Sequence, residues 1–315
     1  MKVFVKISST ICLVLGSIFL LNKLYYFGAT NNKNLKAAYV SSSKINATIL
    51  IHGPCEPLWM LNPTLIDSIT KLNSYNLALS HSDFADNYLH LYLYLKNNNA
   101  PKLLLLYVTP ESMDKNYNTF NTYRFAQYLS DDTVLQVVKE CDADYAKYTP
   151  FPFLNYAYYN KNITFNIIQG IKHKLENRKR PYFINGFEPP AKILWDNNIE
   201  EMREQYPKGY TFKIDSLRVK YLIKTIQLAQ SRGINVVLYE SPVLTESLSC
   251  LKNRDEIIFF VKQLAVKNKV EYIVFKDEKL SASRENYISS LNLSEKSLPV
   301  FNDTLALFIK RIIEQ

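Results

Sequence analysis

The alternation of short apolar runs with amphipathic segments constrains the fold of this chain more than any other feature of its sequence. Strands are predicted at residues 47–52, 75–80, 102–108, 234–239 and 270–275. Helices are predicted between and after them, at residues 62–72, 82–95, 215–230, 255–267 and 304–313, the last capped by Asn302 and Asp303. Strands separated by helices form a parallel sheet with right-handed crossovers, so we expect a three-layer α/β/α sandwich with about five parallel strands.

Residues 112–214 interrupt this alternation and are interpreted as a helical and irregular insertion after the third strand. Tyr and Phe are concentrated between residues 117 and 159, and a basic stretch follows at residues 172–180. Aromatic side chains are ordinary core material, and they also stack on sugar rings, so a packing role and a carbohydrate-binding platform are both open. The basic stretch fits a solvated helix face or a contact with anionic lipid or an acidic polymer.

The first 30 residues carry a membrane-targeting pattern. Lys2 and Lys6 precede an apolar run at residues 7–21, and Tyr25 and Tyr26 follow it. A cleaved signal peptide and an uncleaved anchor are both open, and the length of the segment with its interfacial tyrosines favours the anchor. Residues 31–45 are expected to form a polar stalk, and residues 46–315 the α/β domain. The lysines before the run predict a single-pass protein of the bacterial cell membrane, with this domain outside the cytoplasm, periplasmic or extracellular.

The formal charge of +9 first suggests a nucleic-acid partner, but its distribution does not. Residues 1–36 contain five lysines and no acid, residues 171–180 contribute a further +4, and the remainder is neutral in sum. We therefore expect the membrane, and no nucleic acid, as the partner of these charges. Glycine-rich phosphate loops are missing from the sequence, and its histidines and cysteines show no metal-binding spacing, so no cofactor and no metal are predicted. The oligomeric state is not predicted.

Ligands of open α/β sheets bind beyond the carboxyl ends of the strands, so the loops after the strands should hold the site. Cys55 follows the first strand and His81 ends the adjacent strand, so both are candidate catalytic residues at this edge. Glu240 follows an apolar strand and would face the same crevice. The candidate substrate-binding residues in these loops are Gly53, Glu56, Ser80 and Ser241.

Each candidate also has a structural interpretation. Glu240 can form a salt bridge with a basic residue such as Arg254. Cys55 can be a buried residue or one half of a disulfide with Cys141 or Cys250, and the sequence does not select a pair. Glu56, Glu111 and Glu240 would supply carboxylates for glycosidase chemistry, although nothing in their spacing selects it.

Several of these segments together resemble the SGNH/GDSL hydrolase superfamily, especially its membrane-tethered, exported branch that acts on cell-envelope polymers. The segments are Gly53-Pro54-Cys55 after the first strand, Asn62-Pro63, Asn76 to Ser80, and the third strand ending near Pro110. The resemblance implies a flavodoxin-like sandwich and acyl-ester chemistry, with Cys55 at the place of the family's nucleophile, where a thiolate needs little help from a base. The base would then be His81 or, with poorer geometry, His52, and Glu56 or Asp83 would be the acid or the orienting group.

The family's D-x-x-H block before the last helix is not preserved. The corresponding stretch, Tyr287 to Asn292, keeps Leu-Asn and lacks both the Asp and the His, and no histidine follows residue 174. The usual triad therefore cannot be assembled. We expect a divergent binding or accessory component of cell-envelope or surface-polysaccharide modification. The alternative is an esterase or O-acyltransferase that uses Cys55 on an acylated glycan, and a purely structural envelope protein is a third class.

Overall fold

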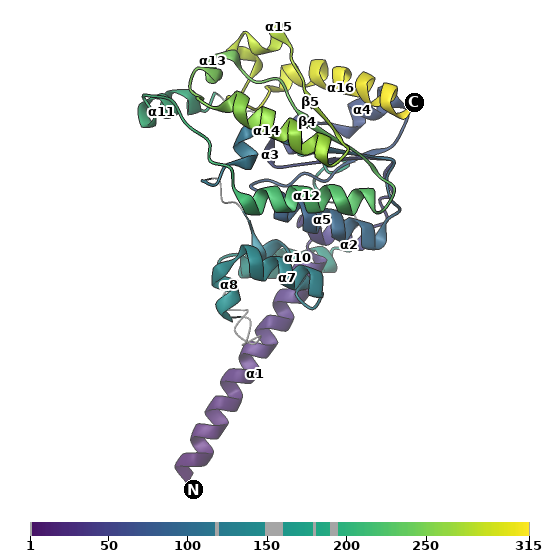
Figure 1. Cartoon of the computed structure of the whole chain (residues 1–315). Helices are drawn as coiled ribbons and strands as arrows, with labels where there is room; N and C mark the ends of the chain where they lie inside the picture. The colour runs from purple at the N-terminus through teal and green to yellow at the C-terminus, as the bar shows by residue number, and fades with distance from the viewer. Residues whose placement is uncertain (1, 117–119, 149–159, 179–180, 190–194, 315) are drawn as a thin grey trace. The chain divides into compact units, whose positions relative to one another are not determined.

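The computed structural model describes residues 2–116, 120–148, 160–178, 181–189 and 195–314 (Figure 1). The chain divides into two compact units. The first contains residues 1–43 and 120–182, and the second contains residues 44–119 and 183–315. All the candidate site residues lie in the second unit, which also contains the sheet.

The second unit is built on a five-stranded parallel sheet with the strand order β2-β1-β3-β4-β5, as in flavodoxin-like folds. The strands are β1 (Ile49–His52), β2 (Ser74–Asn76), β3 (Leu103–Tyr107), β4 (Asn235–Glu240) and β5 (Glu271–Val274). In the register of the sheet, Leu50 of β1 lies between Tyr75 of β2 and Leu104 of β3. Every residue of β3 is buried, because helices cover both faces of a parallel sheet.

The helices are distributed over both units. Those of the second unit are α3 (Cys55–Met60), α4 (Pro63–Thr70), α5 (Phe84–Asn97), α6 (Pro110–Met113), α11 (Asn198–Gln205), α12 (Ser216–Gln230), α13 (Thr245–Leu248), α14 (Arg254–Lys267), α15 (Glu278–Ser281) and α16 (Leu298–Ile313), with 3-10 turns η4 (Arg284–Asn286) and η5 (Glu295–Ser297). Those of the first unit are α1 (Lys2–Asn31), α2 (Lys36–Ser42), α7 (Asp132–Cys141), α8 (Ala143–Tyr148) and α10 (Asn160–Leu175), with 3-10 turns η1 (Thr122–Arg124) and η2 (Ala126–Tyr128).

Two pairs of helices enclose the sheet. Helices α4 and α16 pack together over one face, and α5 and α12 pack together over the other (Figure 1). The core on the first face joins Ile51 and Leu105 of the sheet to Ile66 of α4 and Phe301 of α16. Burying a side chain of this size stabilises the fold by about 1.5–3 kcal/mol. The predicted three-layer sandwich and its parallel strands are confirmed.

Local capping signals explain where several helices begin. The Asp215 carboxylate accepts hydrogen bonds from the backbone N–H groups of Leu217 and Arg218, at 2.7 and 3.1 Å, and caps α12 as predicted. The prediction that Asn302 and Asp303 cap the last helix is wrong. Helix α16 begins at Leu298, and a proline lies in its first turn, where proline is tolerated. Asn302 lies inside this helix, and its Nδ2 donates a hydrogen bond to the carbonyl oxygen of Met60 at 2.8 Å.

The insertion is helical and irregular, but it is divided between the two units. Residues 120–182 fold with the N-terminal segment, and residues 183–214 fold with the sheet. Some aromatic residues of the stretch 117–159 and some basic residues of the stretch 172–180 lie outside the described residues. They are Tyr117, Phe151, Phe153, Tyr156, Tyr158, Tyr159, Lys179 and Arg180. Phe125 and Tyr145 are 0% and 3% exposed, so these two rings are core material of the first unit.

The first unit pairs α1 with α10 at a close approach of two glycines. A Cβ atom on Gly170 would lie 2.0 Å from the carbonyl oxygen of Gly28, so neither position admits a larger residue without separating the helices. Asn22, Tyr25, Gly28 and Ala29 are the buried residues of α1, whereas nearly all side chains of residues 2–20 are exposed. Among the described residues, α1 is the one helix that is long and apolar enough to cross a membrane, with a mean hydropathy of 2.1.

The segment expected to be a polar stalk, residues 31–45, contains a helix. Helix α2 occupies residues 36–42 of this segment, and Ala37, Ala38 and Val40 are buried. The two alanines and the valine form an apolar face, although the segment as a whole is polar.

Candidate functional site

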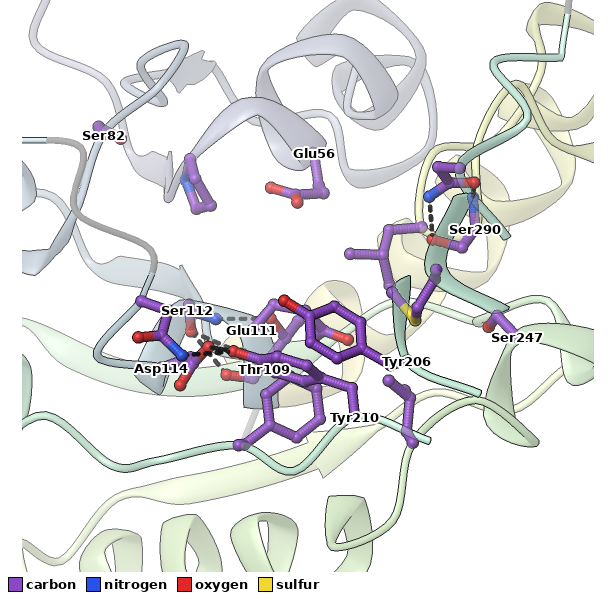
Figure 2. A pocket seen from close by; sticks show the side chains of 17 residues that line it. Glu56, Ser82, Thr109, Glu111, Ser112, Asp114, Tyr206, Tyr210, Ser247 and Ser290 are labelled. Atoms are coloured by element: carbon purple, nitrogen blue, oxygen red, sulfur yellow. Dashed lines mark hydrogen bonds between the residues drawn. The ribbon is translucent and has the colours of Figure 1, made fainter. Parts of the chain in front are cut away.

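A pocket of about 340 Å³ lies at the carboxyl edge of the sheet, within the range of small-ligand sites (Figure 2). Residues that follow β1 and residues that follow β3 face each other across it. These neighbouring strands form the switch point of the 2-1-3-4-5 sheet order, where ligands bind in open α/β folds. The lining residues are Pro54, Glu56, Ser82, Thr109, Glu111, Ser112, Asp114, Asn116, Asn198, Met202, Tyr206, Tyr210, Phe212, Ser247, Leu251, Ser290 and Leu291.

Glu56 enters the pocket from the first turn of α3, after the turn made by Gly53 and Pro54. Gly53 has φ 149°, and a Cβ atom there would lie 2.7 Å from Cβ of Tyr107, so this turn requires glycine. The Glu56 side chain is 8% exposed, and its Oε2 has no hydrogen-bond partner. Burial raises the pKa of Glu56 to about 7, with a smaller increase from the charge of Glu111.

Glu111 enters the pocket from α6, which follows β3. Thr109 and Ser112 fix the start of this short helix, because each side chain accepts a hydrogen bond from the other residue's backbone N–H, at 3.2 and 2.9 Å. Like Glu56, Glu111 has a buried Oε2 without a hydrogen-bond partner. Burial raises the pKa of Glu111. The pocket therefore offers two carboxylate oxygens to the donors of a ligand.

An aromatic wall of the pocket comes from the second part of the insertion. The rings of Tyr206 and Tyr210 meet edge to face with centroids 4.8 Å apart, and those of Tyr210 and Phe212 with centroids 5.2 Å apart. The Tyr210 hydroxyl donates to Asp114, whose Oδ1 also accepts from the backbone N–H of Lys213 at 2.9 Å. Asp114 thus has partners within the protein, and Tyr210 holds the insertion against the end of α6.

The predicted nucleophile, Cys55, forms a second cluster with two other predicted residues. Its Sγ accepts a hydrogen bond from the backbone N–H of His81 at 3.1 Å and lies 3.6 Å from Oγ of Ser80. The Ser80 Oγ is 2.8 Å from Nδ1 of His81. Cys55 is 7% exposed and does not line the pocket, whereas His81 is exposed. The structure thus brings His81 close to Cys55, with the backbone N–H of His81 on the sulfur and its ring on Ser80.

Glu240 lies in a third cluster at the end of β4. Its fully buried carboxylate accepts hydrogen bonds from Arg254 at 2.5 Å and from the Tyr272 hydroxyl at 3.3 Å. The sequence-predicted salt bridge with Arg254 is therefore present. Burial raises the pKa of Glu240 to about 7, and the charge of Arg254 opposes this increase. Ser241, the next residue, lies with its Oγ 3.1 Å from the Tyr107 hydroxyl.

The predicted site residues are thus distributed over three clusters, and Glu56 is the one that lines the pocket with an unpartnered group. Sequence reasoning did not assign Asp114, Tyr206 or Tyr210 to the site. Glu111 was considered only as a carboxylate for glycosidase chemistry, on the ground that it follows β3 by a few residues as Glu56 follows β1. For the tyrosines the only signal was the aromatic content of the insertion.

No family model matches this sequence, and no curated protein matches it. Among solved structures, the chain is similar to a protein of Desulfitobacterium hafniense DCB-2 whose description gives it as a lipolytic protein of the G-D-S-L family. The TM-score is 0.39 and the identity 8%, over 82% of this chain and 98% of that chain.

Ser290 lies in the stretch from Tyr287 to Asn292, where the sequence resemblance would require a histidine, and it lines the pocket. Asn198 of α11 holds it, with Nδ2 donating to Oγ of Ser290 at 2.6 Å and Oδ1 accepting from the Ser290 backbone N–H at 3.2 Å. A serine hydroxyl does not serve as a general base near neutral pH, so this position offers hydrogen bonds and no proton acceptor. In the described part of the chain, no group of three His, Cys, Asp or Glu side chains is arranged to hold a metal ion.

Proposed function

We propose that this protein is a membrane-anchored sugar-binding domain that serves as an accessory component of cell-envelope or surface-polysaccharide modification. The observation that carries the proposal is the pocket, which combines two unpartnered carboxylate oxygens with tyrosine rings and a series of hydroxyl groups. Carboxylates and amides bond to sugar hydroxyls, and aromatic rings pack against the apolar faces of sugars.

The stretch from Tyr287 to Asn292, which lacks the Asp and the His of the family's D-x-x-H block, supports binding without turnover. A serine triad needs a base that removes the proton of the nucleophile, and Ser290 supplies none at that place. Cys55, at the place of the nucleophile, lies outside the pocket lining. The Cys55 side chain therefore does not line the pocket, although its neighbours Pro54 and Glu56 do.

Helix α1 supports the anchor. It is long and apolar enough to span a bilayer, and Lys2 and Lys6 precede its apolar run. By the positive-inside rule the first residues lie in the cytoplasm and the sheet domain outside it, where the polysaccharides of a bacterial envelope are reached.

A glycan panel tests sugar binding. The full chain in detergent micelles is expected to bind a subset of bacterial surface glycans, and Met202→Trp, which fills the pocket, is expected to abolish this binding. Leu307→Trp is the matched control, because Leu307 is 61% exposed on α16 and does not line the pocket. No glycan binding, or unchanged binding by Met202→Trp, would overturn the proposal.

Acyl transfer through Cys55 is the second candidate, and the Cys55–Ser80–His81 cluster favours it. Sγ would attack the ester carbonyl, its proton would pass through Ser80 to Nδ1 of His81, and the alcohol would leave with that proton. The resulting thioester would then transfer its acyl group to a sugar hydroxyl or to water.

Mass spectrometry decides this candidate. Incubation with an activated acyl ester should add one acyl group to the peptide that contains Cys55, with slower addition in His81→Asn. Cys250, which is 4% exposed, serves as the buried control thiol in the same digest. An unmodified Cys55 under conditions that acylate a control thiol enzyme excludes this chemistry.

A further inference from the structure

The charged side chains that line the pocket all carry the same sign. They are Glu56, Glu111 and Asp114, and among the described lining residues none is Lys, Arg or His. Asp114 already has two donors, the Tyr210 hydroxyl and the backbone N–H of Lys213. Glu56 and Glu111 each keep one carboxylate oxygen without a hydrogen-bond partner, and the charge of Arg254 opposes the effect of burial on the pKa of Glu111.

These two glutamates share one arrangement although they lie on different helices. The carboxylate of each accepts a hydrogen bond from its own backbone N–H, and Thr109 adds a further bond to Glu111. The remaining oxygen, Oε2 in both, is buried without a hydrogen-bond partner. Glu56 is only 8% exposed, so bulk water does not replace the missing donor.

We infer that the pocket recognises a sugar that carries a protonated primary amine, whose ammonium group is bound by Glu56 and Glu111. The inference rests on the sugar-binding function proposed above and adds the class of sugar. An ammonium group offers three hydrogen-bond donors, enough for both Oε2 atoms, and a positive charge that is attracted to either carboxylate. A neutral hydroxyl offers one donor and no charge.

The geometry of the pocket leaves room for the rest of such a sugar. The hydroxyls of Ser82, Ser247 and Ser290 surround the pocket away from the two glutamates, and the rings of Tyr206 and Tyr210 form one wall (Figure 2). These groups fit a ring with hydroxyls at its rim and an apolar face. An acylated amine would lose both its charge and most of its donors.

Calorimetric titration with three closely related sugars tests the inference. The full chain in detergent micelles is titrated at pH 7 with D-glucosamine, D-glucose and N-acetyl-D-glucosamine. Glucosamine is expected to bind at least about tenfold more tightly than the other two. Glu56→Gln and Glu111→Gln, which keep the shape and remove the charge, should each reduce this preference to about twofold or less. Glu271→Gln, at an exposed position of β5, is the matched control and should keep the preference.

The outcomes separate the inference from the function on which it rests. Equal affinities for glucosamine and glucose overturn amine recognition and leave sugar binding in place. Failure of all three sugars and of the glycan panel overturns both. An unchanged preference in both glutamine variants, with thermal unfolding as a check that they fold, would show that these carboxylates do not bind the amine.

Discussion

Three glutamates with buried carboxylate oxygens lie at the carboxyl edge of one sheet, and they differ in their partners. Glu240 is bonded to Arg254 and Tyr272, whereas Glu56 and Glu111 each keep one oxygen without a partner. Burial raises the pKa of both Glu56 and Glu240 to about 7. A raised pKa therefore does not distinguish a structural carboxylate from a binding one, and the hydrogen-bond partners do.

The largest effect is expected when the paired carboxylate loses its partner. Arg254→Met leaves Glu240 buried without a counterion and should lower the free energy of unfolding by about 3–5 kcal/mol. Chemical denaturation of the full chain, followed by the fluorescence of Trp59 and Trp195, measures this loss. Glu240→Leu combined with Arg254→Met should recover most of it, because the buried charge is then absent. A loss below about 1 kcal/mol in the single variant would contradict the assignment of Glu240 as a structural ion pair.

The unpartnered carboxylate should be visible in the pH dependence of stability. The pKa of Glu56 is 4.5 in its unperturbed state and about 7 in the folded protein. The folded state therefore binds this proton more tightly than the unfolded state. The stabilising contribution of protonated Glu56 to the free energy of unfolding is present below pH 4.5 and is lost as the pH rises through 7. The shift corresponds to roughly 3 kcal/mol.

Glu56→Gln removes this group and should flatten the decline in unfolding free energy between pH 5 and 7.5. Unfolding curves at several pH values provide the measurement. Glu240→Gln is the informative comparison, because it also removes a carboxyl group with a raised pKa but leaves Arg254 without its partner. Glu240→Gln should lower the free energy of unfolding at every pH. Identical pH profiles of stability for Glu56→Gln and Glu240→Gln would show that Glu56 and Glu240 do not differ in their role.

A smaller effect is expected at the hydrogen bond that satisfies Asp114. Tyr210→Phe removes the hydroxyl that donates to this carboxylate, so Asp114 gains an unpartnered oxygen and stability should fall by about 1–2 kcal/mol. Tyr206→Phe, on the adjacent ring, is the matched variant and should cost less. Thermal unfolding of both variants compares them, and an equal loss in the two would argue against a special role for the Tyr210–Asp114 bond.

The smallest effect is expected at an exposed ion pair near the same edge. Arg284 bonds to Glu200 of α11 and Glu246 of α13, but its side chain is 38% exposed, compared with 13% for Arg254. Arg284→Met should therefore cost at most about 1 kcal/mol. Denaturation under the conditions used for Arg254→Met gives the comparison, and a loss as large as in that variant would show that exposure does not set the energy of these pairs.

The sheet was predictable from the sequence because its signals are local. Apolar runs of strand length alternate with capped helices, and the caps at Asn62 and Asp215 depend on residues two or three positions away. The start of α16 was not predictable in this way. Asn302 and Asp303 form a plausible cap in the sequence, but Asn302 is used for hydrogen bonds to Met60, which is distant in the sequence.

From the sequence, only those site residues could be placed that directly follow neighbouring strands of the sheet. His81 was placed beside Cys55 because the carboxyl ends of adjacent parallel strands meet at one edge. Tyr206 and Tyr210 reach the pocket because the second part of the insertion returns to the sheet, and no local pattern indicates that return. The convergence of Glu56 and Glu111 depends likewise on two short helices whose positions follow from tertiary packing.

Helix α1 carries a segment of membrane-spanning length and a packing surface in one continuous helix. Residues 2–21 rise about 30 Å at about 1.5 Å per residue, which is the thickness of the hydrocarbon core of a bilayer. The next turns carry Gly28, which makes the close approach to Gly170 of α10. Proteolytic removal of the apolar run together with these turns would take away one half of a helix pair. A deletion of one residue before Gly28 would rotate the apolar run by about 100° relative to the packing surface, so a cleavage or deletion near this boundary would be felt by the fold.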